Sequence, residues 1–405
     1  MSHLGYLFQN GRNLTMQKIL ALSLVTSALI LPVSQLTYAA DIKVGMSTAL
    51  SGPAKALGTN VRLGIESYFS KINAQGGVKG NSIKLVALDD GYEPAKAGPN
   101  MRTLIDKDKV VSVIGNVGTP TAIVTVPIAN EKKVPLVGAF TGAGVLRQSP
   151  PDRYIINYRA SYAEETAAMV DGLLKKGIKA DEIAFFTQND GYGDAGYNGA
   201  IAALKKQGVK HADKLAHGRY TRNTLNIEDG LSTLLDADTE PKAIIMVGAY
   251  GPCAKFIKLA KEDFPEALFL NVSFVGSVAL KKALGKDSEG VIITQVVPHF
   301  ESDLPAVKSY RADIKNYQAD ASFGFASLEG YLAAKIFVEG LQLVKGKFTP
   351  ENIVNGLESI SNNDIGIGTP VSYAIDDHQA SHKIWPTIIK NSKFHSLSWD
   401  TIRLN

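Results

Sequence analysis

Cysteine is almost absent from this sequence, since Cys253 is the only one among 405 residues. A single thiol excludes an intramolecular disulfide, and no cysteine lies near the N-terminus, where a lipid anchor would be attached. An excess of charge of one sign is also missing: the net charge is +4, and acidic and basic residues are interspersed. This balance does not indicate a nucleic-acid partner.

The N-terminus lacks an apolar run long enough to span a membrane, which needs about 20 residues. The uncharged run Ile19–Leu31 is shorter, follows Lys18, and is itself followed by the small residues Ala39 and Ala40. This order is typical of a secretory signal peptide. We therefore predict that residues 1–40 direct export to a bacterial periplasm and are cleaved, with an uncleaved anchor as the less favoured alternative. Met16 is an alternative start.

Motifs of common enzyme classes are missing as well. The sequence has no GxSxG elbow and no GxxxxGK[ST] phosphate loop. A GYGDAG segment at Gly191–Gly196 follows a predicted strand, but the acid about twenty residues later, Asp213, lies in a polar segment. We interpret these glycines as allowing a helix start to lie close to a cleft. The sequence predicts no enzyme and no cofactor.

The seven histidines show no spacing typical of metal ligands. His378 and His382 are four residues apart, but they follow two aspartates in a region that reads as strand and loop. We predict that both lie on a solvated surface and that the chain holds no metal.

What the sequence does contain is an alternation of short apolar runs with longer amphipathic segments, which is typical of parallel sheets covered by helices. No linker separates domains in series, so the predicted α/β lobes are interwoven. Helical spacing of apolar residues over 57–72 predicts a core-facing helix. The predicted strands are Ile42–Ser47, Ile83–Leu88, Val110–Ile114, Val134–Val137, Glu182–Thr187, Ala243–Val247 and Val291–Val296.

Loops at the carboxyl ends of such strands usually bind ligands. Here they are rich in Gly, Thr, Ser, Asp and Tyr, and five segments together resemble the leucine/isoleucine/valine-binding branch of the type I periplasmic binding proteins. These segments are IKVGMSTALSG from Ile42, INAQGGVKG from Ile72, VIGNVGTPTA from Val113, GYGDAG from Gly191 and IIMVGAYG from Ile244. The resemblance extends over essentially the whole chain after residue 40.

This resemblance implies two Rossmann-like lobes with parallel sheets, joined by three hinge crossovers near residues 158, 297 and 378. The first lobe would hold residues 41–158 and 297–378, and the second 159–296 and 379–405. The implied function is the solute-binding component of an ABC importer, which captures a small carboxylate by lobe closure and delivers it to an inner-membrane permease and ATPase. The alternative is a periplasmic sensor that feeds a transmembrane receptor; the predicted signal peptide disfavours a cytoplasmic amide-sensing regulator.

The resemblance also implies ligand contacts. Thr119, Thr141 and the backbone amide of Ala139 match first-lobe positions that hold a ligand carboxylate, and Tyr192 and Tyr250 match second-lobe aromatic positions. Hydroxyl groups and free amides at helix starts favour an anion in any case. The alternative for both threonines is an ordinary helix N-cap.

Departures from the family pattern bear on the ligand. Tyr92 and Gly118 stand where well-known members have a disulfide, so Tyr92 is a further candidate contact, and Phe323 keeps an apolar wall position. Ser273 stands where amino-acid-binding members have a glutamate that pairs with the ligand ammonium. Either Asp190 supplies this charge or the ligand has no ammonium. We favour an aromatic or hydroxylated organic acid over leucine.

Overall fold

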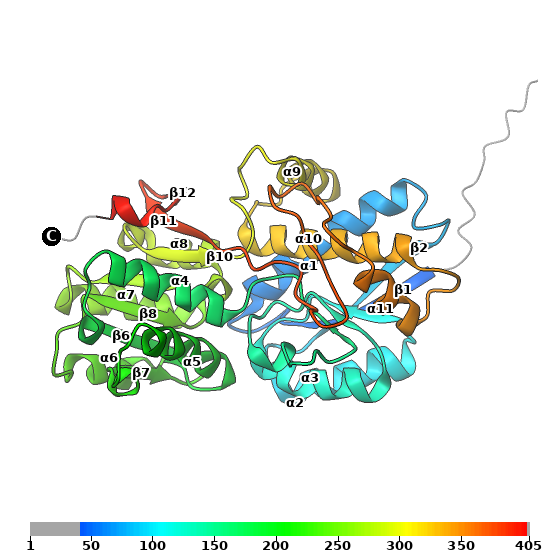
Figure 1. Ribbon diagram of the computed structural model, residues 1–405. Coiled ribbons are helices and arrows are strands. Elements are labelled where there is room, and N and C mark those ends of the chain that lie inside the picture. Colours follow the sequence, from blue (N-terminus) through cyan, green and yellow to red (C-terminus); the bar gives the residue numbers. More distant parts are fainter. Residues whose placement is uncertain (1–40, 403–405) are drawn as a thin grey trace, which may run out of the picture. The chain divides into compact units, whose positions relative to one another are not determined.

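The computed structural model describes residues 41–402 in two β-sheets with their helices (Figure 1). The predicted signal segment lies outside the described residues. The first sheet has the order β2-β1-β3-β4-β5, with all strands parallel. Its strands are β1 (Asp41–Thr48), β2 (Ser82–Asp89), β3 (Ser112–Ile114), β4 (Leu136–Val137) and β5 (Ile155–Ile156).

Six α-helices accompany the first sheet. They are α1 (Lys55–Ala74), α2 (Pro94–Arg102), α3 (Thr119–Lys132), α9 (Pro305–Tyr317), α10 (Phe325–Leu343) and α11 (Pro350–Glu358). Helix α1 packs along α10, and in Figure 1 helices α2 and α3 lie on the opposite side of the sheet.

The second sheet has the order β12-β11-β10-β9-β8-β6-β7 and is parallel except for β11 and β12. Its strands are β6 (Ile183–Gln188), β7 (His217–Tyr220), β8 (Ala243–Val247), β9 (Leu268–Asn271), β10 (Ile292–Gln295), β11 (Trp385–Lys390) and β12 (Lys393–Ser396). Its helices are α4 (Tyr162–Lys175), α5 (Gly191–Lys206), α6 (Glu228–Leu235), α7 (Tyr250–Asp263) and α8 (Ser277–Leu284).

The predicted apolar stripe of α1 is confirmed, since Leu57, Val61, Ile65, Tyr68, Phe69 and Ile72 are all buried. Glycines bring α1 close to α10. A Cβ on Gly64 would lie 1.9 Å from the carbonyl oxygen of Ser327, and one on Gly330 would lie 2.2 Å from that of Val61. No larger residue fits at either position, so these two glycines allow α1 and α10 to pack closely against each other.

The chain passes between the sheets three times: after β5, after β10, and before β11. The first and third passages run side by side, because the amide of Asn157 donates to the carbonyl of His378 at 2.7 Å and the amide of Ala380 donates to the carbonyl of Asn157 at 3.0 Å. Residues 37–405 cluster as a single unit. The lobe boundaries at 158, 297 and 378 therefore stay predictions.

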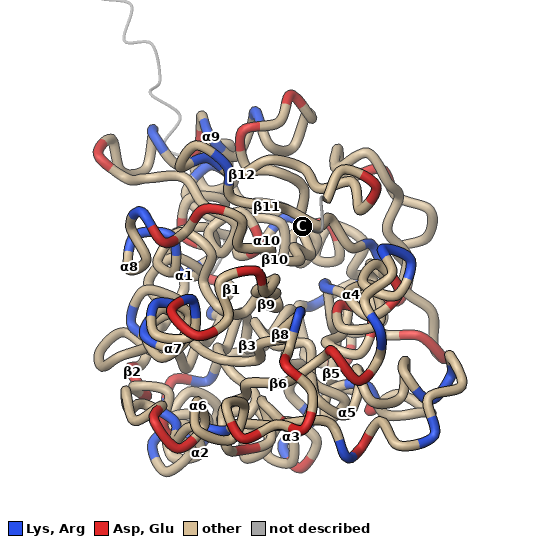
Figure 2. The backbone as a smooth tube through the Cα atoms, turned by 90° about the vertical axis from the view of Figure 1, so that its left-hand side faces the viewer, with Lys and Arg blue, Asp and Glu red and all other residues tan. Residues whose placement is uncertain are grey.

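The predicted α/β class with parallel sheets is confirmed, and every strand predicted from the sequence overlaps a strand of the structure. The sequence did not predict β5, which has two residues, β7, with the polar sequence HGRY, or β9, β11 and β12. Among the described residues, no helix combines the length and hydropathy that a membrane crossing requires. Figure 2 shows basic and acidic residues intermixed along the chain.

Candidate functional site

Two threonines meet at the carboxyl ends of β3 and β4. Thr119 is the first residue of α3, and Thr141 lies in the loop after β4. Their hydroxyl oxygens are 2.6 Å apart and both side chains are buried. Neither side chain caps an α-helix: Gly118 is the N-cap of α3, and the Thr141 hydroxyl accepts only a long 3.4 Å bond from the Ala143 amide. The N-cap alternative is therefore wrong.

Ala139 lies in the loop after β4, two residues before Thr141. It is buried, and its carbonyl accepts a 2.8 Å bond from the amide of Thr141. The next residue, Phe140, forms a bridge with Val117. The loops after β3 and β4 are thus joined through their backbones, which fixes the distance between the two threonine hydroxyls.

Five aromatic side chains pack beside the threonines, and we call them the aromatic cluster: Tyr92, Phe140, Tyr162, Tyr192 and Phe274. The ring of Phe274 is central, with its centroid 4.6 Å from Tyr192, 5.4 Å from Phe140, 5.9 Å from Tyr92 and 6.4 Å from Tyr162. Tyr92 and Phe140 belong to loops of the first sheet, and the others to segments of the second. All five are buried.

Tyr162 links the aromatic cluster to the threonines. It is the first residue of α4, behind Ser161, whose capping box with Glu164 starts the helix. Burial raises the pKa of Tyr162 to about 12, although the charge of Arg159 acts in the opposite direction. The phenol therefore stays protonated and able to donate. The Tyr162 hydroxyl is buried and has no hydrogen-bond partner among the described residues. Thr119, Thr141 and Tyr162 form a group of three hydroxyls at one end of the aromatic cluster.

Tyr92, one of the two residues at the family's disulfide positions, lies between β2 and α2. It has a left-handed backbone with φ of 65°, stabilised by a 2.8 Å bond from its amide to the carboxylate of Asp90. Its ring lies against Gly118, where an added Cβ would be 2.1 Å from a ring carbon. Its hydroxyl accepts a 3.1 Å bond from the Gln188 side chain at the end of β6. Tyr92 therefore contacts a loop of the first sheet through its ring and the end of a second-sheet strand through its hydroxyl.

The predicted site residues before α5 have structural partners of their own. Asp190 is the N-cap of α5 and accepts a 3.0 Å bond from the Tyr192 amide. Its carboxylate also accepts bonds from Gln188 at 2.8 Å and Arg222 at 3.2 Å. Tyr192 donates its hydroxyl to the carbonyl of Gly248 at 3.2 Å. The Tyr192 ring, not its hydroxyl, is thus presented to the cluster.

Ser273 belongs to a buried ionic group. Glu165 on α4 accepts bonds from the Ser273 amide at 2.8 Å and its hydroxyl at 2.9 Å. The Arg159 guanidinium contacts Ser273, pairs with Glu165 at 2.7 Å, and lies 3.4 Å from Glu329 of α10. Burial raises the pKa of Glu329 to about 7, although Arg159 opposes this. Glu165, the carboxylate that contacts Ser273, is thus already paired with Arg159.

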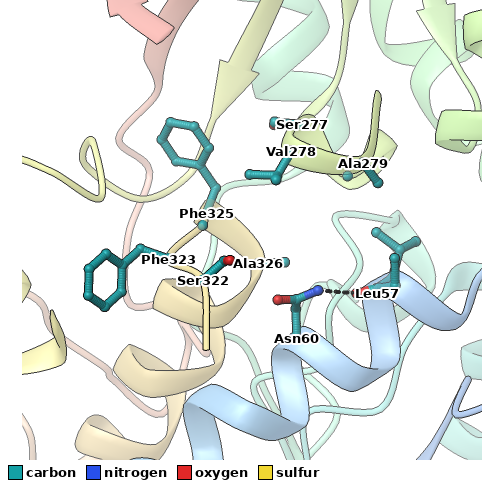
Figure 3. A pocket seen from close by; sticks show the side chains of 12 residues that line it. Leu57, Asn60, Ser277, Val278, Ala279, Ser322, Phe323, Phe325 and Ala326 are labelled. Atoms are coloured by element: carbon teal, nitrogen blue, oxygen red, sulfur yellow. Dashed lines mark hydrogen bonds between the residues drawn. The ribbon is translucent and has the colours of Figure 1, made fainter. Parts of the chain in front are cut away.

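A separate cavity, which we call the outer pocket, lies between the starts of α1, α8 and α10 and measures about 150 Å³ (Figure 3). Phe323 lines it, but in Figure 3 its ring points away from Val278 and Leu57, and it packs 5.8 Å from Tyr310. Tyr250 lies at the start of α7, is half-buried, and donates its hydroxyl to the carbonyl of Pro53. This hydrogen bond joins segments of the two sheets.

A charged contact joins two other loops of the sheets, the one after β2 and the one after β7. Arg222 pairs with Glu93 at 2.8 Å, and the Asn223 side chain donates to Glu93 at 2.6 Å. The Arg222 guanidinium also lies 5.9 Å from the centre of the Tyr92 ring. Together with the Tyr250 bond, these contacts hold the loops of the two sheets against each other around the aromatic cluster.

The structure thus brings together Thr119, Ala139, Thr141, Tyr92, Tyr192 and Ser273, whereas Phe323 and Tyr250 lie toward the outer pocket and Asp190 is held by Arg222. Sequence reasoning missed Tyr162, Phe140, Phe274 and Arg159. Two signals were available: Ser161 and Glu164 form a capping-box pattern that places Tyr162 at a helix start, and Phe274 adjoins Ser273.

One prediction about the histidines was wrong. His378 is buried, not solvated: its ring contacts the Glu358 carboxylate at 3.0 Å and the carbonyl of Ile155 at 2.9 Å. His378 is part of the third passage between the sheets, and its carbonyl accepts a hydrogen bond from the amide of Asn157 on the first passage. This pairing accounts for its burial. His382 is exposed and contacts Glu164 at 2.6 Å. Within residues 41–402, no cluster of three metal-ligating side chains is found.

Comparisons with known proteins agree with this arrangement. Residues 41–393 match the family described as "Periplasmic binding protein". The chain is 27% identical over 330 residues to "Leu/Ile/Val-binding protein homolog 7" of Brucella abortus, covering 76% of this chain and 78% of that relative.

Two solved structures are similar over most of the chain. A possible leucine/isoleucine/valine-binding protein from Rhodopirellula baltica is 49% identical with a TM-score of 0.88, covering 90% of this chain and 98% of that one. A substrate-binding periplasmic protein from Ralstonia solanacearum is 27% identical with a TM-score of 0.80, covering 88% and 100%. The chain therefore belongs to the periplasmic binding proteins of type I fold, in their leucine/isoleucine/valine-binding branch, whose members bind solutes and are not enzymes.

Proposed function

We propose that this protein is the solute-binding component of an ABC importer, which captures a small carboxylate-bearing ligand in a periplasm by closing two lobes over it. The family membership supports solute binding and an importer partner. The lobes would be 41–158 with 297–378, and 159–296 with 379–405. The permease and ATPase of an inner membrane would then receive the ligand.

The observation that carries this proposal is the pair of buried threonine hydroxyls, 2.6 Å apart, at the carboxyl ends of two neighbouring parallel strands. Hydroxyls donate to a carboxylate, and hydrogen bonds to a charged group are stronger than those between neutral groups. Tyr162 adds a third hydroxyl, and the aromatic faces of Tyr92 and Tyr192 supply an apolar enclosure. A small molecule with one carboxylate and an apolar body suits this combination.

The ligand that these groups favour has no ammonium. Residues 269–276 contain no acid, and the carboxylates of Asp190 and Glu165 are already paired, with Arg222 and Arg159. Enclosing an unpaired ammonium costs several kcal/mol, against the roughly 8 kcal/mol that a micromolar affinity represents. We therefore propose an aromatic or hydroxylated organic acid in preference to leucine.

A calorimetric titration tests both parts of the proposal. We expect aromatic and hydroxy acids to bind, and leucine, isoleucine and valine to bind at least about tenfold more weakly. Micromolar binding of leucine that is abolished in Asp190→Asn would overturn the proposed ligand class and identify Asp190 as the ammonium partner. Absence of binding by every carboxylate of the panel would contradict the proposed function itself.

A further inference from the structure

Phe274 fills the space between the two sets of loops that the proposed function assigns to the ligand. Its side chain is fully buried, and four aromatic rings surround it. Two of these, Tyr92 and Phe140, come from the first sheet, whereas Tyr162 and Tyr192 come from helix starts of the second. Phe274 therefore contacts segments of both sheets.

The backbone that carries Phe274 is a short turn and not a strand or a long helix. Residues Ser273–Val275 form a single 3-10 turn between β9 and α8, which ends at Gly276 with φ of 80°. The turn is anchored at Ser273 through Glu165, one residue before the ring. An anchor at that point fixes the backbone, but it leaves the side chain of Phe274 able to change its rotamer when the facing loops separate.

Two of the rings around Phe274 lie close to polar groups of the candidate site. Phe140 is followed by Thr141, and the buried Tyr162 hydroxyl has no hydrogen-bond partner within residues 41–402. Both of these rings contact Phe274. A molecule with a ring in the place of Phe274 and a carboxylate at the three hydroxyls would satisfy both halves of the site.

We propose that the Phe274 ring occupies the subsite for the ring of an aromatic monocarboxylate, and that the ligand binds by displacing this side chain. The inference rests on the proposed function and specifies its substrate class. The four surrounding rings are tilted or edge-on to Phe274, which is the geometry that aromatic pairs prefer. An aliphatic chain would lose these ring contacts, so the subsite selects flat ligands.

Displacement has a measurable consequence for affinity. When a side chain occupies the subsite for most of the time, the apparent dissociation constant equals the intrinsic constant divided by the small fraction of open sites, so it is raised. Removing the Phe274 ring should therefore strengthen the binding of an aromatic acid. If Phe274 were instead a wall that touches the ligand, its removal would weaken binding. The two possibilities predict opposite signs.

The test is a calorimetric titration of wild type, Phe274→Ala and Phe274→Leu with 3-phenylpropionate, benzoate and hexanoate. We expect Phe274→Ala to bind 3-phenylpropionate at least about tenfold more tightly than wild type, with a smaller gain for hexanoate. Phe348→Ala, a half-buried phenylalanine between α10 and α11, is the matched control and should leave affinity unchanged. Unchanged or weaker binding by Phe274→Ala and Phe274→Leu would overturn the inference.

A second measurement does not depend on the carboxylate. Toluene should raise the Tm of Phe274→Ala but not that of wild type or Phe348→Ala, because only that variant has a ring-sized space in the cluster. No shift in Phe274→Ala would contradict the ring subsite. If 3-phenylpropionate binds wild type but binds Phe274→Ala no more tightly, the inference fails and the proposed function stands. If no carboxylate binds any variant, the proposed function fails as well.

Discussion

Thr141 combines two features at the scale of a single residue: its side chain is buried, and its hydroxyl lies 2.6 Å from that of Thr119. A hydrogen bond to a charged group contributes about 1.5–3 kcal/mol. We expect Thr141→Ala to weaken a carboxylate ligand about tenfold or more in a calorimetric titration. Thr141→Ser keeps the hydroxyl and should retain most of the affinity. Equal affinities of wild type and Thr141→Ala would remove Thr141 from the site.

Glu329 makes stability depend on pH. Its pKa in the folded chain is raised to about 7 by burial, against an ordinary value of 4.5, with Arg159 opposing the rise. Between these pH values the folded chain binds a proton that the unfolded chain has released, so protonation stabilises the fold and this contribution is lost as pH rises through 7. Thermal unfolding should show Tm falling between pH 5 and 7.5, with a shallower slope in Glu329→Gln. An identical slope in both proteins would refute this assignment.

At the scale of elements, the start of α5 depends on close packing against β6. An added Cβ on Gly193 would lie 1.9 Å from the carbonyl oxygen of Gln188. Gly193→Ala must push α5 from the sheet and displace Tyr192, and overpacking of this kind costs about 1–3 kcal/mol. We expect a lower Tm and weaker ligand binding. Gly144→Ala, where an added Cβ meets no atom within 4 Å, is the control that should change neither.

The sequence predicted the elements better than the contacts between them. The strand Ala243–Val247 and the stripe of α1 were predictable because apolar pattern and burial agree over several residues. β7 was missed because its sequence HGRY is polar, and it is held by pairing with β6. Phe274 and Arg159 were missed because their roles depend largely on distant partners, such as Tyr92 for Phe274 and Glu329 for Arg159. No local pattern reports such contacts.

At the scale of the whole molecule, the candidate contacts come from both sheets, and two interactions join the facing loops: the Tyr250 bond to Pro53 and the ion pair of Arg222 with Glu93. Lobe closure on a ligand requires these contacts to form and break. We expect small-angle scattering to give a larger radius of gyration for the free protein than for the protein saturated with a tight ligand. Identical dimensions in both states would contradict binding by closure.

The pairing of α1 with α10 has a consequence for biogenesis. The apolar stripe of α1 (Lys55–Ala74) is covered by a helix that begins at Phe325, after five strands of the second sheet, β6 to β10, have been synthesised. A ribosome adds roughly 5–20 residues per second, so the stripe waits roughly ten to fifty seconds for its partner. During that time the nascent N-terminal half exposes a hydrophobic surface that a chaperone can bind. Contacts so distant along the chain also slow folding, which keeps the precursor unfolded for longer.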